Sequence, residues 1–205
     1  MGAALSLGIT RFSYGLLLPA MREQLGWSYA LAGAMNTANA AGYMVGATML
    51  PILLRHRAST WPFVWGGVWA ALFMASCGFF NDAWVLLLQR FLAGVACAWV
   101  FVSGGVLAAR LAQQHPNQSG WLLALYYGGT GWGIVACALV VPWVMPQAAD
   151  WPQAWWWLGA LCVCALWPMV LAARACAAPS DTRTPEQTHN DANQWPQQRA
   201  RMVWV

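Results

Sequence analysis

An isolated arginine close to the start of the chain is the first residue that could do chemistry. Arg11 lies in a mostly apolar run. If that run is a helix across a bilayer, Arg11 lies roughly 14 Å from its start and near the bilayer centre. A permanent charge there costs several kcal/mol unless it faces protein or water. Arg11 therefore either attracts an anion in a cavity or bonds to carbonyl groups and to polar side chains such as Tyr14, Asn36 or Asn39.

A second set of polar residues follows helical spacing. Asn36, Asn39, Tyr43 and Gly46 are separated by three, four and three positions, which places them on one face of a helix. Buried amides need hydrogen-bond partners, so this face should point into a helix bundle. Asn36 and Asn39 either join helices together or contact a substrate directly.

Arg90 begins another stripe on one helical face. The stripe contains Arg90, Gly94, Cys97, Phe101 and Gly104. An arginine near a helix end can extend to the membrane surface. The small residues on the same face instead favour contact with protein, and we expect Arg90 and Phe101 to face a substrate cavity.

Glycines are concentrated in the run from Tyr126 to Gly133. Gly129 and Gly133 form a pair of small residues four positions apart, which suits close helix packing. Gly128 and Gly131 add to a helix that can bend or slide. The run is therefore either a packing surface or a hinge for gating, and the same two interpretations apply to Gly94.

Several kinds of chemistry are excluded by the positions of the reactive residues. The carboxylates and histidines lie outside the apolar runs, at Glu23, Asp82, Asp150, Asp181, Glu186, Asp191, His56, His115 and His189. Proton relay, metal binding and cofactor chemistry within the apolar runs are therefore not expected. Ser103 has no histidine in the last apolar run to activate it, so a serine protease is excluded. We expect no enzymatic activity.

The composition identifies the kind of protein that positions these residues. Of the 205 residues 60% are hydrophobic and only 8% are charged, whereas soluble domains carry about a quarter charged residues. The chain is therefore predicted to be a membrane protein. All basic side chains other than histidine are scattered arginines, which argues against nucleic-acid binding.

The fold class predicted is all-α, with transmembrane helices in a polytopic membrane protein. A helix needs roughly 20 apolar residues to cross a bilayer, and polar breaks divide the chain into six such stretches. They run from Ala3 to Met21, Tyr29 to Leu54, Trp61 to Phe80, Trp84 to Leu111, Gly120 to Met145 and Gln153 to Ala173. The short breaks make consecutive helices antiparallel neighbours.

The arginines also predict the orientation. Arg55, Arg57, Arg110 and Arg174 flank one set of connections, and cytoplasmic loops are enriched in basic residues. Both termini should therefore be cytoplasmic. Residues 1–175 should form the helical unit, and residues 176–205 a disordered cytoplasmic tail, because they are polar and rich in proline.

The third and sixth stretches differ from the others because they have many tryptophans and few polar groups. We expect them to face lipid through their large side chains, which are Trp65, Trp69, Trp155, Trp156, Trp157 and Trp167.

Five runs, in order, resemble one family. They are Gly8–Pro19, Asn36–Tyr43, Arg90–Gly94, Phe101–Arg110 and Tyr126–Ile134. They look like the N-terminal half of major facilitator superfamily (MFS) transporters, and are most similar to the YbfB/YjiJ type. The resemblance covers nearly everything up to Arg174.

The resemblance implies roles for the helices. The first and fourth would line a central cavity, the second and fifth would meet another half, and the third and sixth would face lipid. Arg90 to Gly94 is similar to the arginine motif of the superfamily's fourth helix, and the glycine-rich fifth helix to its domain-interface motif. Such proteins hold two six-helix halves around the substrate.

These observations lead to one expectation for function and one alternative. The first is an MFS-type secondary transporter that moves a small solute by alternating access in a bacterial inner membrane. The solute is anionic if Arg11 binds it. We expect a truncated or half-length form that needs a second six-helix half or a homodimer partner. The alternative is a membrane remnant or helix-interaction subunit that transports nothing.

Overall fold

The computed structural model describes residues 1–177, and all its long elements are helices. The expected tail lies almost entirely outside the described residues. A π-helical turn, η1 (Ala4–Ile9), leads into α1 (Thr10–Leu25), followed by α2 (Tyr29–His56) and α3 (Thr60–Ser76) with the short η2 (Cys77–Phe79). The rest comprises α4 (Ala83–Gln114), η3 (Pro116–Gln118), α5 (Ser119–Val144), η4 (Ala148–Asp150) and α6 (Trp151–Ala177). The all-α fold class is confirmed.

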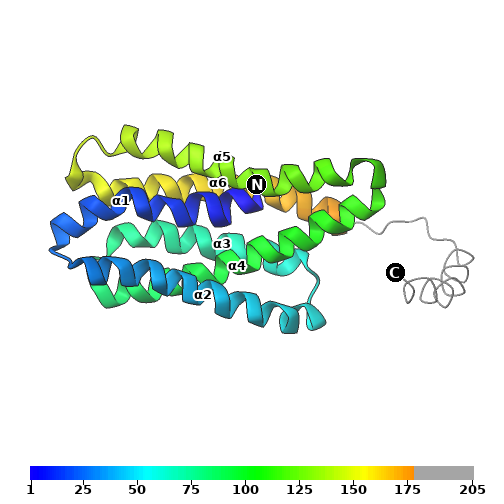
Figure 1. Cartoon of the computed structure of the whole chain (residues 1–205), viewed down its shortest axis with the longest axis horizontal. Coiled ribbons are helices and arrows are strands. Elements are labelled where there is room, and N and C mark those ends of the chain that lie inside the picture. The colour runs from blue at the N-terminus through cyan, green and yellow to red at the C-terminus, as the bar shows by residue number, and fades with distance from the viewer. Residues whose placement is uncertain (178–205) are drawn as a thin grey trace, which may run out of the picture.

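Five of these segments are long and apolar enough to cross a membrane. They are Tyr29–His56, Thr60–Phe79, Ala83–Gln114, Pro116–Val144 and Ala148–Cys176. The first of the six expected spans, which forms η1 and α1 and carries Arg11, Arg22 and Glu23, is not one of them. It nevertheless runs alongside the other helices in the bundle (Figure 1).

Local signals explain where the helices begin and end. The side chain of Ser28 accepts a hydrogen bond from Leu31 N at the start of α2, and Asp82 accepts bonds from the first turn of α4. Gly26 ends α1 with a φ of 64°, a conformation in which glycine has no Cβ to clash.

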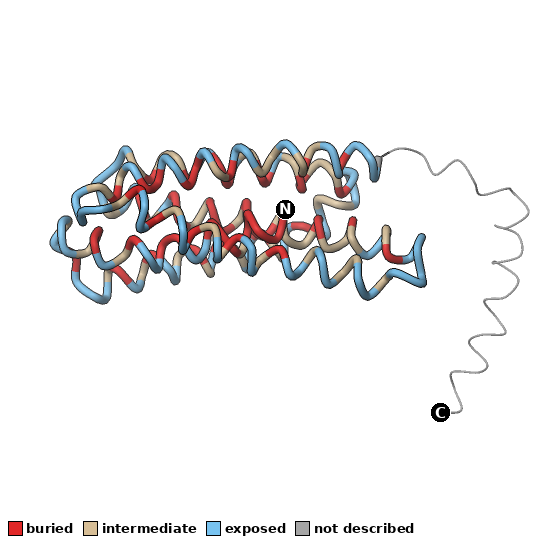
Figure 2. The backbone as a smooth tube through the Cα atoms, turned by 90° about the horizontal axis from the view of Figure 1, so that it is seen from above, coloured by how far each residue is buried: buried red, intermediate tan, exposed pale blue. Residues whose placement is uncertain are grey.

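The helices run along one long axis, with α2 and α5 at opposite edges of the bundle in the view of Figure 1. The α2 helix packs mainly against α4, α3 packs against α4 and α6, and α5 packs against η1. Figure 2 shows that the buried residues lie where helices face one another. This packing fixes which side chains of α1, α2, α4 and α5 remain on the surface.

The tryptophans of α3 and α6 are not all on the outside. Trp65, Trp69 and Trp167 are exposed as expected, but Trp155 is fully buried. The expectation that Trp155 faces lipid was therefore wrong. Its indole ring lies close to the guanidinium of Arg90, which occupies the interior of the bundle.

Candidate functional site

The Arg11 cavity is a mostly apolar hollow between α1 and α2 that contains a few polar groups, with a volume of about 350 Å³. Five of its lining residues come from α1 and three from α2, and they are Arg11, Phe12, Tyr14, Gly15, Leu18, Ala32, Gly33 and Asn36. Arg11 and Asn36 are both exposed. The structure thus brings together a cation and an amide that are 25 positions apart in the sequence.

Arg11 stands just after the π-helical turn. Thr10 closes this turn, where its backbone N–H and its side-chain hydroxyl both donate to Leu5 O. A π turn widens the helix and is common at functional sites. Among the described residues, arginine side-chain hydrogen bonds are made by Arg90 and Arg110 but not by Arg11. Within the described part of the chain, the Arg11 guanidinium is therefore available to bind a ligand.

Arg90 lies in a different environment. Its side chain is only 2% exposed, and both terminal nitrogens donate to Thr10 O at 3.4 Å. Its guanidinium carbon is 4.9 Å from the centroid of Tyr14 and 5.7 Å from that of Trp155. A carbonyl and two aromatic faces thus compensate its charge and join α4 to α1 and α6.

Arg90 therefore does not occupy the cavity-facing place that we expected. The helical stripe correctly put Arg90 on the same face as Gly94, but that face meets other helices. Within residues 1–177, Arg90 Nε has no hydrogen-bond acceptor. Arg90 is therefore a structural arginine that joins helices. The sequence had offered this role as one of two alternatives for Arg11.

Tyr14 connects the two arginines. Its side chain is almost completely buried, its ring lies beside the Arg90 guanidinium, and part of it lines the Arg11 cavity. The hydroxyl donates to Ala32 O at 2.8 Å, which fixes α1 against α2. Tyr14 therefore forms the wall between the cavity and the interior.

The two asparagines divide between the two interpretations of their helix face. Asn36 is exposed in the Arg11 cavity. Asn39 is buried, and its side-chain nitrogen donates to Arg90 O at 3.0 Å. Asn39 thus joins α2 to α4, whereas Asn36 is placed to meet a ligand.

Three of the predicted glycines pack helices inside the chain. A Cβ at Gly94 would overlap Asn39 O, so this glycine lets α4 and α2 touch. Gly129 and Gly133 are buried against η1, where a Cβ at Gly8 would lie 2.6 Å from Gly133 Cα. Gly129 and Gly133 therefore form the packing surface that was one of the two interpretations of this run, and they pack within the chain and not at the domain interface that the resemblance implied for the fifth helix.

The remaining glycines of α5 face open space. Gly128 and Gly131 are exposed, and a Cβ built on either would meet nothing within 4 Å. Helix packing therefore does not require glycine at these positions.

An aromatic cluster lies at the contact of α4 and α5. We define it as Phe101, Tyr126 and Tyr127, whose ring centroids are 5.1 to 6.2 Å apart. Tyr126 donates to Phe101 O at 2.8 Å, and Tyr127 is 49% exposed. The sequence identified Phe101 but not the tyrosines, because only the fold shows which residues of α5 face Phe101.

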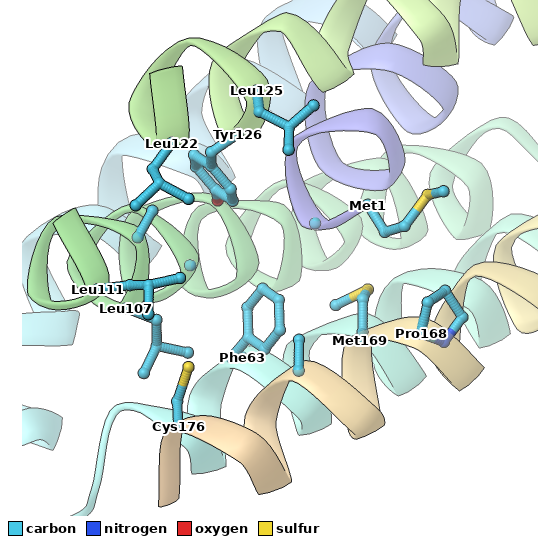
Figure 3. Close-up of a pocket in the computed structure, with 14 residues that line it drawn as sticks. Met1, Phe63, Leu107, Leu111, Leu122, Leu125, Tyr126, Pro168, Met169 and Cys176 are labelled. Atoms are coloured by element: carbon cyan, nitrogen blue, oxygen red, sulfur yellow. The ribbon is translucent and has the colours of Figure 1, made fainter. Parts of the chain in front are cut away.

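A second cavity is apolar and lies away from Arg11. Figure 3 shows side chains from α3, α4, α5 and α6 that point into one space beside Met1. Its volume is about 290 Å³, and Phe63, Leu107, Leu122 and Met169 are among its lining residues. Such a lining offers no charge to orient a polar ligand, so we take the Arg11 cavity as the candidate site.

The other reactive groups considered in the sequence are Ser103 and the side chains that could hold a metal. The Ser103 hydroxyl is buried and donates to Trp99 O. No group of three or more His, Cys, Asp or Glu residues that could hold a metal occurs in residues 1–177.

Comparison with known proteins identifies the family of the chain. The profile of a family described as the uncharacterised MFS-type transporter YbfB matches residues 3–204. The chain belongs to this MFS family. The chain is also similar to the inner membrane transport protein YdhP of Escherichia coli K12 and of E. coli O157:H7, with 31% identity over 116 residues. The matched part is 57% of this chain and 30% of each relative.

Family membership confirms the resemblance seen in the sequence. In transporters built from two repeats the substrate site lies near the bilayer midplane, between the repeats. Arg11 of this MFS chain lies about 20 Å along the helix axis from the end of α1.

Proposed function

We propose that this MFS chain forms one wall of a transporter for small organic anions. The observation that carries the proposal is the exposed Arg11, which lies about 20 Å along the helix axis from the end of α1, lines a cavity and makes no side-chain hydrogen bond among the described residues. Arginine presents a planar pair of donors that matches a carboxylate in two bonds. Asn36 adds a neutral donor and acceptor to the same cavity.

Transport requires a second wall. A guanidinium at this depth cannot face lipid without a large cost, so the Arg11 face must meet water or protein. A second six-helix unit, supplied by another half or by another copy of the chain, would enclose this face. The solute would then move by alternating access as the two units rock around it.

The exposed faces of α2 and α5 are the proposed contacts with that unit. Met44 of α2 and Leu139 of α5 are each 70% exposed. Cysteine at either position, in a chain without its native cysteines, should give crosslinked dimers if a second copy is the partner. Cysteine at the exposed Trp167 of α6 is the matched control, and crosslinking there instead would contradict the proposed interface.

We also propose a location in the bacterial inner membrane with both chain ends in the cytoplasm. The family and the printed name of the E. coli relatives support the membrane, and the arginine distribution supports the orientation. Reporter fusions should place residues 55–60 and 112–119 in the cytoplasm and residues 81–83 outside. The opposite pattern would overturn the orientation.

Binding of a simple anion tests the proposal. The full chain in lipid nanodiscs should bind benzoate at least about tenfold more tightly than benzamide, since only the carboxylate forms charged hydrogen bonds with Arg11. Ligand-observed NMR measures such weak binding directly. Equal binding of the two, or binding of neither, would contradict the proposed function.

A further inference from the structure

We propose that the solute is a monocarboxylate with a short apolar chain, and that one end of the Arg11 cavity receives this chain. We define this apolar end as Gly15, Leu18, Ala32 and Gly33. The inference deepens the proposed function and rests on it, because Arg11 would hold the carboxylate of the same molecule. It adds a class of solute and a set of specificity-determining residues.

The Arg11 cavity changes in character along α1. Its lining residues on this helix share one face and run from Arg11 through Gly15 to Leu18. Arg11 and Leu18 are seven residues apart, which corresponds to about 10 Å along the helix axis. Leu18 lies nearer the end of α1 at Leu25. The α1 wall is therefore charged at its inner part and apolar towards the connection with α2.

The α2 wall has the same order of polar and apolar residues. Ala32 and Gly33 lie close to the start of this helix, and Asn36 follows about one turn further along it. Because α2 runs back alongside α1, the later residue Asn36 lies further in. Tyr14 donates to Ala32 O and holds the two walls together. Both helices thus place their polar lining residues at the inner part of the cavity.

Two glycines keep the apolar end open. Gly15 and Gly33 are both exposed, and a Cβ built on either would meet nothing within 4 Å. They differ in this from Gly94, whose Cβ would overlap the backbone of α2. The space beside Gly15 and Gly33 is therefore free for a few carbon atoms of a ligand. Most ligand pockets combine such an apolar lining with a few polar groups that orient the ligand.

The charges along the cavity favour a single carboxylate on the solute. Within residues 1–177, Arg11 is the one charged residue in the lining. Arg22 lies four positions beyond Leu18 and outside the lining, with its guanidinium carbon 4.3 Å from the centroid of the Tyr29 ring. Glu23 follows it, so this end of α1 has no net positive charge. A second carboxylate at the apolar end would lose water without gaining a cation of its own.

Displacement of benzoate from the full chain in nanodiscs tests the inference, because it counts only ligands that compete for the Arg11 cavity. Hexanoate, gluconate and adipate each have six carbon atoms and differ in hydroxyl groups or in charge. We expect hexanoate to displace benzoate at a concentration at least about tenfold lower than either of the others, since one buried CH₂ is worth about fourfold in affinity. Equal potency, or a preference for gluconate or adipate, would overturn the inference.

Substitution then locates the chain of the solute. Gly33→Leu fills the apolar end, so hexanoate should bind about tenfold more weakly while acetate, which has no such chain, binds as before. Gly120→Leu is the matched control, because Gly120 is also exposed with nothing within 4 Å of a built Cβ but lies outside the cavity. It should leave the affinity for hexanoate unchanged. An unchanged affinity in Gly33→Leu, or an equal loss for acetate, would overturn the assignment.

The two proposals fail in distinguishable ways. If benzoate binds more tightly than benzamide but hexanoate has no advantage over gluconate and adipate, the anion site remains and the inference about the chain is wrong. If benzamide binds as well as benzoate, the proposed anion site is wrong whatever the chain preference. The comparison of the three anions uses the unchanged chain, so it decides the inference even if Gly33→Leu does not fold.

Discussion

Arg11 and Arg90 carry the same charge and lie within the same bundle, yet their surroundings differ almost completely. Arg90 is buried and bonded to Thr10 O, with Tyr14 and Trp155 beside its guanidinium. Arg11 is exposed in a cavity next to Asn36. The adjacent residues Thr10 and Arg11 thus differ in role. The carbonyl oxygen of Thr10 accepts hydrogen bonds from the structural Arg90, whereas the guanidinium of Arg11 lines the cavity without a hydrogen bond among the described residues.

This difference shows how a membrane protein can keep two charges for two purposes. A buried arginine needs nearby groups that compensate its charge, which for Arg90 are one carbonyl oxygen and two aromatic faces. A ligand-binding arginine must instead be left without partners in the protein.

Gly94→Leu should have the largest effect on folding. Its side chain would overlap the α2 backbone at Asn39, so the helices would have to separate. Little folded protein should reach the membrane, as measured by expression and gel filtration. Gly131→Leu is the control, because its side chain enters open space. Normal folding of Gly94→Leu would show that α2 and α4 are not in close contact.

Arg90→Ala should destabilise the fold by about 2 to 5 kcal/mol, the range for large-to-small changes in a packed core. The change leaves a cavity beside Tyr14 and Trp155 and removes the bonds to Thr10 O. Thermal unfolding in detergent measures this loss. An unfolding temperature equal to that of the unchanged protein would mean that Arg90 is not part of the core.

Asn39→Ala should cost about 1 kcal/mol, because it removes one buried hydrogen bond to Arg90 O. Asn36→Ala should leave thermal stability unchanged and weaken benzoate binding a few-fold. Paired melting and binding measurements compare the two variants. The account would be contradicted if Asn36→Ala destabilised the fold and Asn39→Ala did not.

Much of the fold could be predicted from the sequence because bilayer thickness sets the length of an apolar helix. Tyr29 began a helix as expected, and the short polar breaks gave the antiparallel order. Helical spacing also placed Asn36 and Asn39 on one side of α2, although the first lines the Arg11 cavity and the second contacts α4. Periodicity identifies a face of a helix but not the helix that it meets.

That limit explains the errors in the candidate site. Arg90 and Trp155 lie far apart in the sequence, and neither has a local signal that it packs against the other. Gly129 and Gly133 have the spacing of an interface between chains but pack against η1 of the same chain. The aromatic cluster also depends on a partner helix. Gly104 and Gly105 of α4 make room for the Tyr126 and Tyr127 side chains of α5, and this contact exists only once the two helices pack.

Benzoate affinity per folded molecule in Arg11→Met, measured together with its melting temperature, tests the central claim most directly. The account predicts that Arg11→Met inserts and melts like the unchanged chain but loses benzoate binding. Arg11→Lys should retain weakened binding, since an ammonium lacks the paired donors of a guanidinium. If Arg11→Met fails to accumulate in the membrane while its folded fraction binds benzoate as before, Arg11 is a structural residue and the account is contradicted.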